Sequence, residues 1–216
     1  MLIKLFVSLA IYIGLLITIL SSIEPSSSSD ANSAVLDTQG NKVQSGVEYY
    51  VRPAITDDVG GYVTLIDRVC NNGSCPLCIG QQNVVGASRF SMKFTPFIEG
   101  ESVVRENRDF KAVFKALTLC VQSTEWKVGD QESVKRLIVA CDGGDDQGLL
   151  KGFFRIEKGN LGIYYFVWCP LEVCRNCRLN CSYVGSFTDE NGNRILALGA
   201  NSTLPLIFEK VNDVSS

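Results

Sequence analysis

The sequence contains no histidine among its 216 residues. Without an imidazole the chain can form no Ser-His-Asp triad, no Cys-His dyad and no histidine metal site. Carboxylate pairs, lysines and thiolates could still catalyse, so this absence disfavours an enzyme without excluding one. A basic run is also missing, and the formal net charge is -3. The chain therefore has no electrostatic footprint for nucleic acid.

Proline is scarce at 6 residues, whereas glycine is common at 19, and this balance suits a chain with many tight turns. Sustained helical periodicity is missing as well. Short apolar runs recur instead with turn residues between them, from Tyr62–Ile66 to Leu204–Phe208. This spacing predicts an all-β barrel or sandwich with one substantial core.

The first twenty residues are typical of a secretory signal. Lys4 supplies a positive charge, and Leu5–Leu20 is an almost unbroken apolar run followed by two serines. A signal anchor is the alternative, but a Ser-rich stretch follows at once and no basic stop-transfer cluster appears. We therefore predict a signal peptide over 1–24, a flexible spacer or propeptide over 25–34, one domain over 35–211 and a tail over 212–216.

The start of the predicted domain carries the most information. Val35–Ala54 indicates a strand, a turn and a strand, because Gln39-Gly40-Asn41 tolerates positive φ and Glu48–Val51 is aromatic and β-branched. This stretch resembles the opening V-L-D-x-x-G-x-x-L/V-x-x-G-x-x-Y-Y-x-x-P of the plant Kunitz-type (soybean trypsin inhibitor) family. The matching positions are Val35, Leu36, Asp37, Gly40, Val43, Gly46, Tyr49, Tyr50 and Pro53.

Later segments resemble the same family. They are Asn72–Leu77, Val103–Glu106, Gly152–Lys158, Tyr164–Pro170 and Asn191–Leu198. The cysteine spacing over 169–181 is similar to the miraculin-like branch of that family. The resemblance implies an all-β fold of the β-trefoil type, a closed barrel with a hairpin cap and pseudo-three-fold symmetry, stapled by disulfides.

Nine cysteines behind a secretory signal indicate an oxidising compartment. The resemblance implies three disulfides, namely Cys75–Cys120, Cys169–Cys181 and Cys174–Cys177. A zinc site made of the last four cysteines is the competing interpretation. It is disfavoured, because a secreted chain oxidises such thiols and no histidine assists. We predict no metal and no cofactor.

Cys70, Cys78 and Cys141 have no partner in the family pattern. A Cys70–Cys78 bond is sterically feasible and leaves Cys141 over. An odd cysteine indicates either an intermolecular disulfide or a buried, inert thiol. The sequence therefore predicts either a monomer or a disulfide-linked dimer.

Three sequons predict glycosylation at Asn72, Asn180 and Asn201. Asn201 is the safest of these sites. At Asn180, a disulfide at the neighbouring Cys181 is expected to hinder access.

The resemblance places an inhibitory loop between the first pair of conserved cysteines. The corresponding segment is Gly86–Pro96, and aligning its Phe-x-Pro motif makes Lys93 the residue inserted into a protease, between Met92 and Phe94. A lysine on a rigid, exposed loop can pair with an aspartate at the floor of the S1 pocket. The alternative is an alternating strand with Phe90, Met92 and Phe94 inside and Lys93 outside.

Loop support is predicted to be weaker here than in the family's inhibitors. Those inhibitors hold the loop with an asparagine at the position occupied by Ser45. A serine reaches less far and donates fewer hydrogen bonds, so the loop is expected to be less rigid.

The resemblance implies a secreted inhibitor of a trypsin-like serine endopeptidase, located in the apoplast or the vacuole. The alternatives are a miraculin-like binding or defence protein, or an inhibitor of another protease class that uses a different loop. An enzyme built on Asp142, Asp145 and Asp146 is the weakest hypothesis, because the surrounding glycines indicate a solvated turn. We expect a protease as the partner, and neither nucleic acid nor, after signal cleavage, a membrane.

Overall fold

The computed structural model describes residues 33–55, 61–69, 77–82, 89–117, 123–132, 134–140 and 146–212. Several predictions concern residues outside these ranges. They are the signal peptide, most of the spacer, the Cys75–Cys120 bond, Cys70, Cys141, the sequon at Asn72, and Asp142 with Asp145. The chain divides into Met1–Ala31 and a larger unit, Asn32–Ser216, which contains every described residue. No described helix has the length and apolar character needed to span a membrane.

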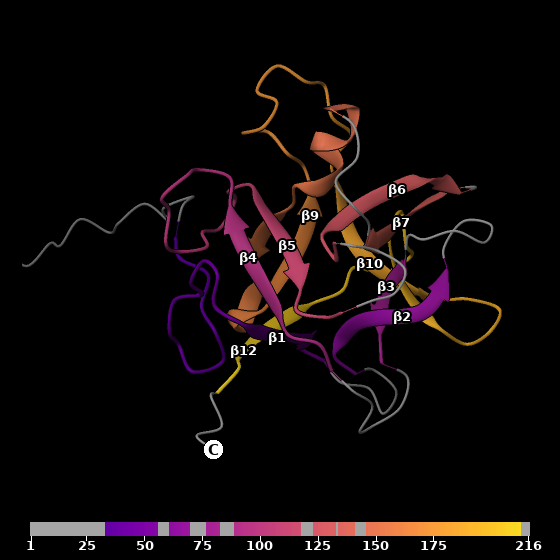
Figure 1. Ribbon diagram of the computed structural model, residues 1–216, viewed down its shortest axis with the longest axis horizontal. Helices are drawn as coiled ribbons and strands as arrows, with labels where there is room; N and C mark the ends of the chain where they lie inside the picture. The colour runs from indigo at the N-terminus through magenta and orange to yellow at the C-terminus, as the bar shows by residue number, and fades with distance from the viewer. Residues whose placement is uncertain are drawn as a thin grey trace, which may run out of the picture. The chain divides into compact units, whose positions relative to one another are not determined.

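Strands dominate the described regions (Figure 1). They are β1 (Tyr49–Pro53), β2 (Val63–Val69), β3 (Leu77–Gln81), β4 (Met92–Pro96), β5 (Phe110–Phe114), β6 (Trp126–Glu132), β7 (Lys135–Ala140), β8 (Arg155–Lys158), β9 (Tyr164–Trp168), β10 (Ser182–Thr188), β11 (Arg194–Leu198) and β12 (Leu206–Lys210). Two short 3-10 helices, η1 (Asp146–Gly152) and η2 (Asn160–Gly162), complete the set. The all-β class predicted from the sequence is confirmed.

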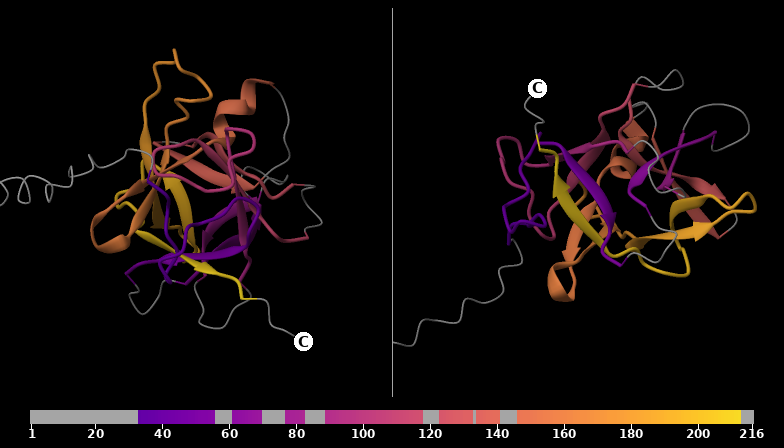
Figure 2. Two further views of the ribbon diagram at one scale, coloured as in Figure 1. Left: turned by 90° about the vertical axis from the view of Figure 1, so that its left-hand side faces the viewer. Right: turned by 90° about the horizontal axis from the view of Figure 1, so that it is seen from below.

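The strand pairs are antiparallel, and they form two groups that the pairing of β10 with β9 joins. In the first, β1 pairs with both β12 and β4, β4 pairs with β5, and β9 pairs with β8 and β12. The pairing of β12 with β1 brings the first and last strands side by side (Figure 2). Between β5 and β8, a single bridge joins Phe110 to Phe154 through two hydrogen bonds of 2.9 Å.

The second group consists of three hairpins, β2–β3, β6–β7 and β10–β11. One strand of each hairpin pairs with the others, since β3 pairs with β7, β7 with β11, and β11 with β3. The hairpins thus associate through their second strands, although they lie far apart in the sequence.

The opening stretch folds largely as the sequence predicts. Gly40 and Gly46 adopt φ of +80° and +73°, which a residue with a Cβ reaches only at a cost. After the second turn, β1 buries Tyr49 and Val51 and leaves Tyr50 half-buried, the alternation of a half-buried strand. Before the first turn, the predicted strand is reduced to isolated bridges.

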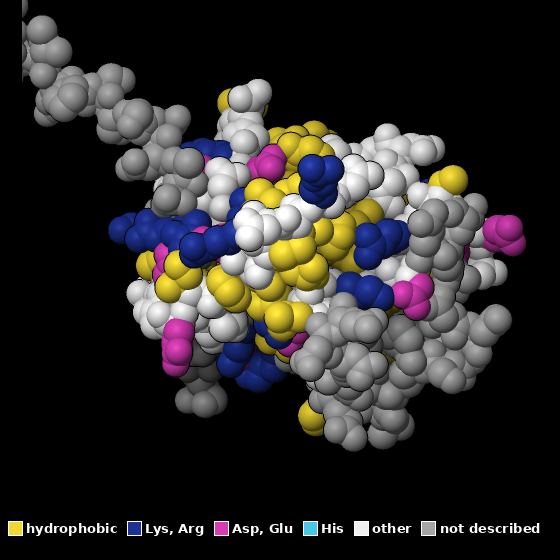
Figure 3. All heavy atoms as spheres, turned by 90° about the horizontal axis from the view of Figure 1, so that it is seen from above, with side chains coloured by type: hydrophobic (Ala, Val, Ile, Leu, Met, Phe, Trp, Pro, Cys, Tyr) yellow, Lys and Arg dark blue, Asp and Glu magenta, His cyan; other side chains and the backbone are white. Residues whose placement is uncertain are grey.

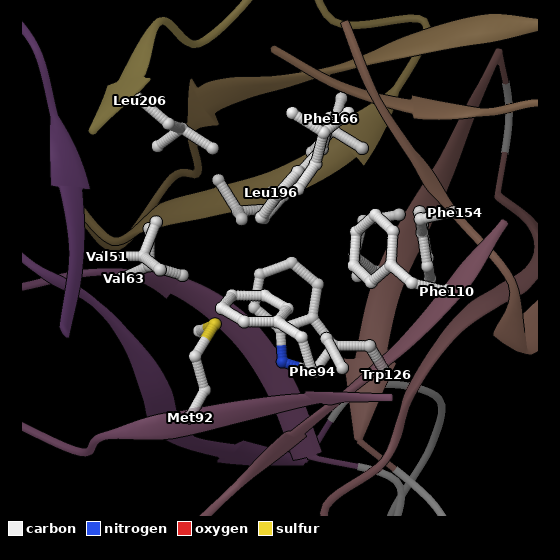
Figure 4. Close-up of a cluster of buried hydrophobic side chains, with 14 of the residues drawn as sticks. Val51, Val63, Met92, Phe94, Phe110, Trp126, Phe154, Phe166, Leu196 and Leu206 are labelled. Carbon is white, nitrogen blue, oxygen red and sulfur yellow. The ribbon is translucent and has the colours of Figure 1, made fainter. Parts of the chain in front are cut away.

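Aromatic side chains fill the centre of the core (Figure 4). The ring of Phe94 lies 5.6 Å from the rings of both Phe110 and Phe208 in edge-to-face geometry. The Trp126 ring lies 5.6 Å from that of Phe166 in the same geometry. Such pairs contribute about 0.5–1.5 kcal/mol each beyond the burial of their area. Strand β4 therefore supplies a central part of the core.

Candidate functional site

The segment predicted to insert into a protease is part of this core. Met92 and Phe94 are both fully buried, and all five residues of β4 pair in register with β5. Placing Met92, Lys93 and Phe94 in an exposed loop was therefore wrong. The alternating-strand interpretation is correct for these three residues, because burying the apolar side chains of Met92 and Phe94 stabilises the fold while Lys93 faces outward.

The side chain of Lys93 points out of the core and is 41% exposed. Its Nζ lies 3.8 Å from Glu48 Oε1, and the same carboxylate is 2.7 Å from Lys115 Nζ. Glu48 also accepts a hydrogen bond of 2.9 Å from Ser91 Oγ. The hydrogen bond from Lys115 is the largest cause that lowers the pKa of Glu48, with burial acting in the opposite direction. Lys93 thus belongs to a shared ion-pair cluster on a strand.

This geometry does not suit substrate-like insertion at Lys93. A protease must reach the main chain on both sides of the inserted residue, and here both neighbours are buried and hydrogen-bonded within a sheet. Because β4 is paired with β5 and partly buried, its geometry does not support Lys93 as the residue inserted into a protease.

Ser45 lies in the turn next to β4. Its backbone N–H donates to Ser102 O at 2.9 Å, and the N–H of Gly46 donates to Phe94 O at 3.0 Å. Within the described part of the chain, the Ser45 hydroxyl has no hydrogen-bond partner. The turn therefore contacts β4 through its backbone, and side-chain support of a loop by Ser45 stays a prediction.

The sequence reasoning missed Arg89, an exposed basic residue just before β4. Its guanidinium carbon lies 4.4 Å from the centroid of the Tyr50 ring and 4.9 Å from that of Tyr62. The two rings are themselves 5.7 Å apart in edge-to-face geometry. Cation–π contacts of this kind hold the arginine in one region of the surface. The sequence does show Arg89 as a second basic residue, four positions before Lys93, and this could have indicated an alternative candidate.

A carboxylate completes the surroundings of Arg89. The Tyr62 hydroxyl donates to Glu209 Oε2 at 2.7 Å, and Arg52 forms an ion pair with the same carboxylate. Burial, followed by the hydrogen bond to Glu209, raises the pKa of Tyr62. Burial alone acts to raise the pKa of Glu209, but hydrogen bonds from Tyr62 and Arg52 keep it below its ordinary value. The group therefore fixes Tyr62 beneath the guanidinium.

Both disulfides predicted within the 169–181 loop are present. Cys169–Cys181 and Cys174–Cys177 have Cα–Cα distances of 4.7 and 5.4 Å. With these four cysteines oxidised, the competing zinc site has no thiolate ligands left. Cys78 is also disulfide-bonded, and Cys70, the partner considered for it, lies outside the described residues.

The same loop is tied to the rest of the domain by Asp109, which is almost fully buried. Its Oδ2 accepts hydrogen bonds from the backbone N–H of Glu172 at 2.6 Å and of Val173 at 3.0 Å. Its Oδ1 pairs with Arg155. In return, Glu172 accepts from the Asp109 backbone at 2.8 Å and pairs with Arg108 at 2.6 Å. These contacts fix the loop independently of its disulfides.

The two described sequons are both on the surface. Asn180 and Asn201 are exposed, so their side chains are accessible for modification. Glycosylation at either site stays a prediction.

Figure 3 shows hydrophobic side chains gathered on one face of the domain, with Lys and Arg side chains around them. Phe97 and Leu149 are among the exposed hydrophobic residues. The Phe97 ring packs 5.4 Å from that of Phe153, which directly follows η1. Phe97 therefore lies partly exposed against the buried ring of Phe153.

Comparison with known proteins places these features in one family. The legume Kunitz family model, described as trypsin and protease inhibitor, matches residues 35–210. A curated relative, Kunitz type trypsin inhibitor 106 of Medicago truncatula, is 42% identical over 82% of this chain and 86% of its own. Miraculin of Synsepalum dulcificum is 31% identical over 85% of each chain.

The fold agrees with a solved structure of the same kind. The Kunitz-type cysteine protease inhibitor PCPI-3 from potato superposes with a TM-score of 0.66 at 26% identity, over 84% of this chain and 98% of that one. Match length, identity and fold lead to one conclusion. The chain belongs to the plant Kunitz family of trypsin and protease inhibitors, whose members are inhibitors and not enzymes.

Proposed function

We propose that this protein is a secreted inhibitor of a trypsin-like serine endopeptidase, and that Arg89 is the basic residue it presents. The observation that carries the proposal is the position of Arg89. It is exposed, it lies outside any strand, and only Phe90 and Ser91 separate it from the start of β4. Its relative in Medicago truncatula, named a trypsin inhibitor, supports this class of target.

The main chain around Arg89 is better placed for a protease than that around Lys93. In the described part of the chain, no backbone hydrogen bond joins Arg89 to another residue. Two residues later the chain is already fixed, because Ser91 O accepts a 2.8 Å hydrogen bond from the Lys115 N–H. A segment anchored at one side has lost part of its conformational freedom before binding, and this loss favours affinity.

The side chain of Arg89 has the chemistry that the S1 pocket of a trypsin-like protease requires. A guanidinium forms a bidentate pair with a buried carboxylate such as the aspartate at the floor of that pocket. Entering the pocket means leaving the rings of Tyr50 and Tyr62, which costs about 0.5–1 kcal/mol for each exposed cation–π contact. A buried, bidentate charge pair at an interface is worth more than this cost.

The test is inhibition of trypsin by the oxidised, full-length mature protein and by two variants, Arg89→Ala and Lys93→Ala. We expect Arg89→Ala to weaken inhibition about 100-fold or more, the effect of losing a central interface residue. Lys93→Ala is the matched control, because it removes a second basic side chain from the same segment, and it is expected to inhibit almost as well as the parent protein. The proposal fails if Lys93→Ala loses inhibition and Arg89→Ala keeps it.

A second candidate function has one observation in its favour. The Lys93 strand and the unbonded Ser45 hydroxyl are unlike the rigid loop predicted for a trypsin inhibitor. A related potato structure is described as a cysteine protease inhibitor. If the parent protein leaves trypsin active but inhibits papain, the target belongs to that other protease class and a different loop binds it.

We further propose that the described strands form a β-trefoil. The pairings support a ring of β1, β4, β5, β8, β9 and β12, in which the Phe110–Phe154 bridge joins β5 to β8. The three mutually paired hairpins then form the cap. Amide hydrogen exchange tests the closure, because the Phe110 and Phe154 N–H groups are expected to be as protected as those of β1.

Secretion and the domain limits are also proposals. The N-terminal apolar run and the two described disulfides support export to an oxidising compartment, the apoplast or the vacuole. The family match over 35–210 supports a domain over 35–211. Expression in a secreting eukaryotic cell, followed by mass spectrometry of the mature N-terminus, tests both, and retention of residues 1–24 contradicts the signal peptide.

A further inference from the structure

The guanidinium of Arg89 occupies a small aromatic site on the surface of the domain. Its central carbon lies 4.4 Å from the centroid of the Tyr50 ring and 4.9 Å from that of the Tyr62 ring. The two rings meet edge to face, with an angle of 71° between their planes. In the other cation–π contacts among the described residues, each cation faces a single ring. Two aromatic walls therefore hold this guanidinium.

A carboxylate forms the third side of the site. Glu209 lies opposite Tyr50 in the pairing of β1 with β12, and its Oε2 accepts the 2.7 Å hydrogen bond from the Tyr62 hydroxyl. The Glu209 side chain is 26% exposed, so it is in contact with solvent. We refer to Tyr50, Tyr62 and Glu209 as the tyrosine cage. Two π faces beside a carboxylate are the groups that recognise an organic cation such as a guanidinium.

The tyrosine cage is built by contacts that do not involve Arg89. Tyr50 belongs to β1, and the backbone of Tyr62 is fixed because its carbonyl oxygen accepts a 3.0 Å hydrogen bond from the Gln82 N–H. The remaining oxygen of Glu209, Oε1, is paired with an arginine of β1. Removal of the Arg89 side chain is therefore expected to leave the cage formed and open.

The backbone does not force Arg89 into the cage. Among the described residues, none forms a backbone hydrogen bond with Arg89, so its side chain and not the path of the segment accounts for the contact. The residue is also exposed, so the cage opens to solvent at the position of the guanidinium. An arginine on another molecule can reach that position once Arg89 has left. Arg89 thus identifies the ligand that the cage accepts.

We propose that the tyrosine cage is a binding site for an exposed arginine of a partner protein, and that Arg89 occupies it in the free inhibitor as an internal substitute. The emptying of the cage rests on the proposed function, in which Arg89 enters the S1 pocket of a protease. The recognition of a guanidinium does not rest on it, because it depends only on the three residues of the cage.

The experiment is an NMR titration of the oxidised Arg89→Ala protein with N-acetyl-arginine methylamide, followed at the ring protons of Tyr50 and Tyr62. We expect saturable shifts with a dissociation constant on the order of 1 mM, as suits a few exposed contacts. N-acetyl-citrulline methylamide has the same shape without the charge and is expected to bind at least about tenfold more weakly. The arginine ligand is expected to bind the parent protein equally weakly, because Arg89 fills the cage there.

Two variants in the Arg89→Ala background assign the binding to the cage. Tyr50→Leu keeps apolar bulk but removes one π face, and it is expected to weaken binding of the arginine ligand at least about fivefold. Tyr183→Leu is the matched control. Tyr183 also meets a second tyrosine edge to face and donates to a carboxylate, but it faces no cation among the described residues. This control is expected to leave the affinity unchanged.

Three results overturn the proposal. They are the absence of a saturable shift in the Arg89→Ala protein, equal binding of the citrulline ligand, and unchanged affinity after Tyr50→Leu. None of them depends on the trypsin assay. Failure of the proposed function is seen separately, as inhibition that the Arg89→Ala protein retains.

Discussion

The side chain of Phe94 shows how packing in the core fixes the position of one residue. It contacts the rings of Tyr49, Phe110, Phe166 and Phe208 and has no exposed surface. We predict that Phe94→Ala lowers the free energy of unfolding by about 3–5 kcal/mol, because the cavity adds to the lost transfer energy. Urea denaturation measures this effect. Leu117→Ala, at a fully exposed position, is the control and is expected to cost almost nothing.

Asp109 holds the loop over 169–181 against the rest of the domain. Its carboxylate is fully buried and pairs with Arg155 while accepting two backbone N–H groups. We predict that Asp109→Asn destabilises the protein by about 3 kcal/mol, because it leaves the Arg155 charge without its buried partner. Asp130→Asn removes an exposed carboxylate from an ion pair and is expected to cost less than about 1 kcal/mol. Equal losses in the two variants contradict the role of Asp109.

Two glutamates set the pH dependence expected at the residue scale. The pKa values of Glu48 and Glu209 are lower in the folded protein than in an exposed chain. Their ionised forms therefore stabilise the fold above about pH 4.5, and this stabilisation is lost as pH falls through the lowered folded pKa values. Thermal unfolding between pH 7 and pH 2 measures it. Glu48→Gln is predicted to show a smaller loss on acidification than the parent, and Glu190→Gln, an exposed site, an unchanged loss.

At the scale of elements, the sequence predicted those features that depend only on residues close together in the chain. The positive φ of Gly40 and Gly46 and the alternation of β1 follow from residue types within a few positions. The bonds Cys169–Cys181 and Cys174–Cys177 were implied by the resemblance of the cysteine pattern over 169–181 to the miraculin-like branch of the family. The same alternation indicated β4, but the family alignment of Lys93 competed with it, and burial of both neighbours in the core decided between them.

What the sequence could not indicate depends on residues far apart in the chain. Arg89 lies over Tyr50 and Tyr62, and Tyr62 in turn bonds to Glu209, 147 positions away. No local pattern relates these residues, because the contact exists only once β12 has paired with β1.

For the whole molecule, the proposed function assigns the contact with a protease to the segment before β4. If the protein inhibits as a poor substrate, as proposed, prolonged incubation with catalytic amounts of protease is expected to cleave the one bond that occupies the active site. If Arg89 enters the S1 pocket, that bond is the one between Arg89 and Phe90. If Lys93 enters instead, it is the bond between Lys93 and Phe94, which lies inside β4.

The measurement that tests this most directly is mass spectrometry of the oxidised, mature protein after incubation with catalytic trypsin. We predict a single new terminus at Phe90, formed slowly while most of the protein remains intact and inhibitory. A new terminus at Phe94 contradicts the assignment to Arg89 and means that β4 opens when the protease binds. Rapid cleavage at many sites, without inhibition, contradicts the proposed trypsin inhibition itself.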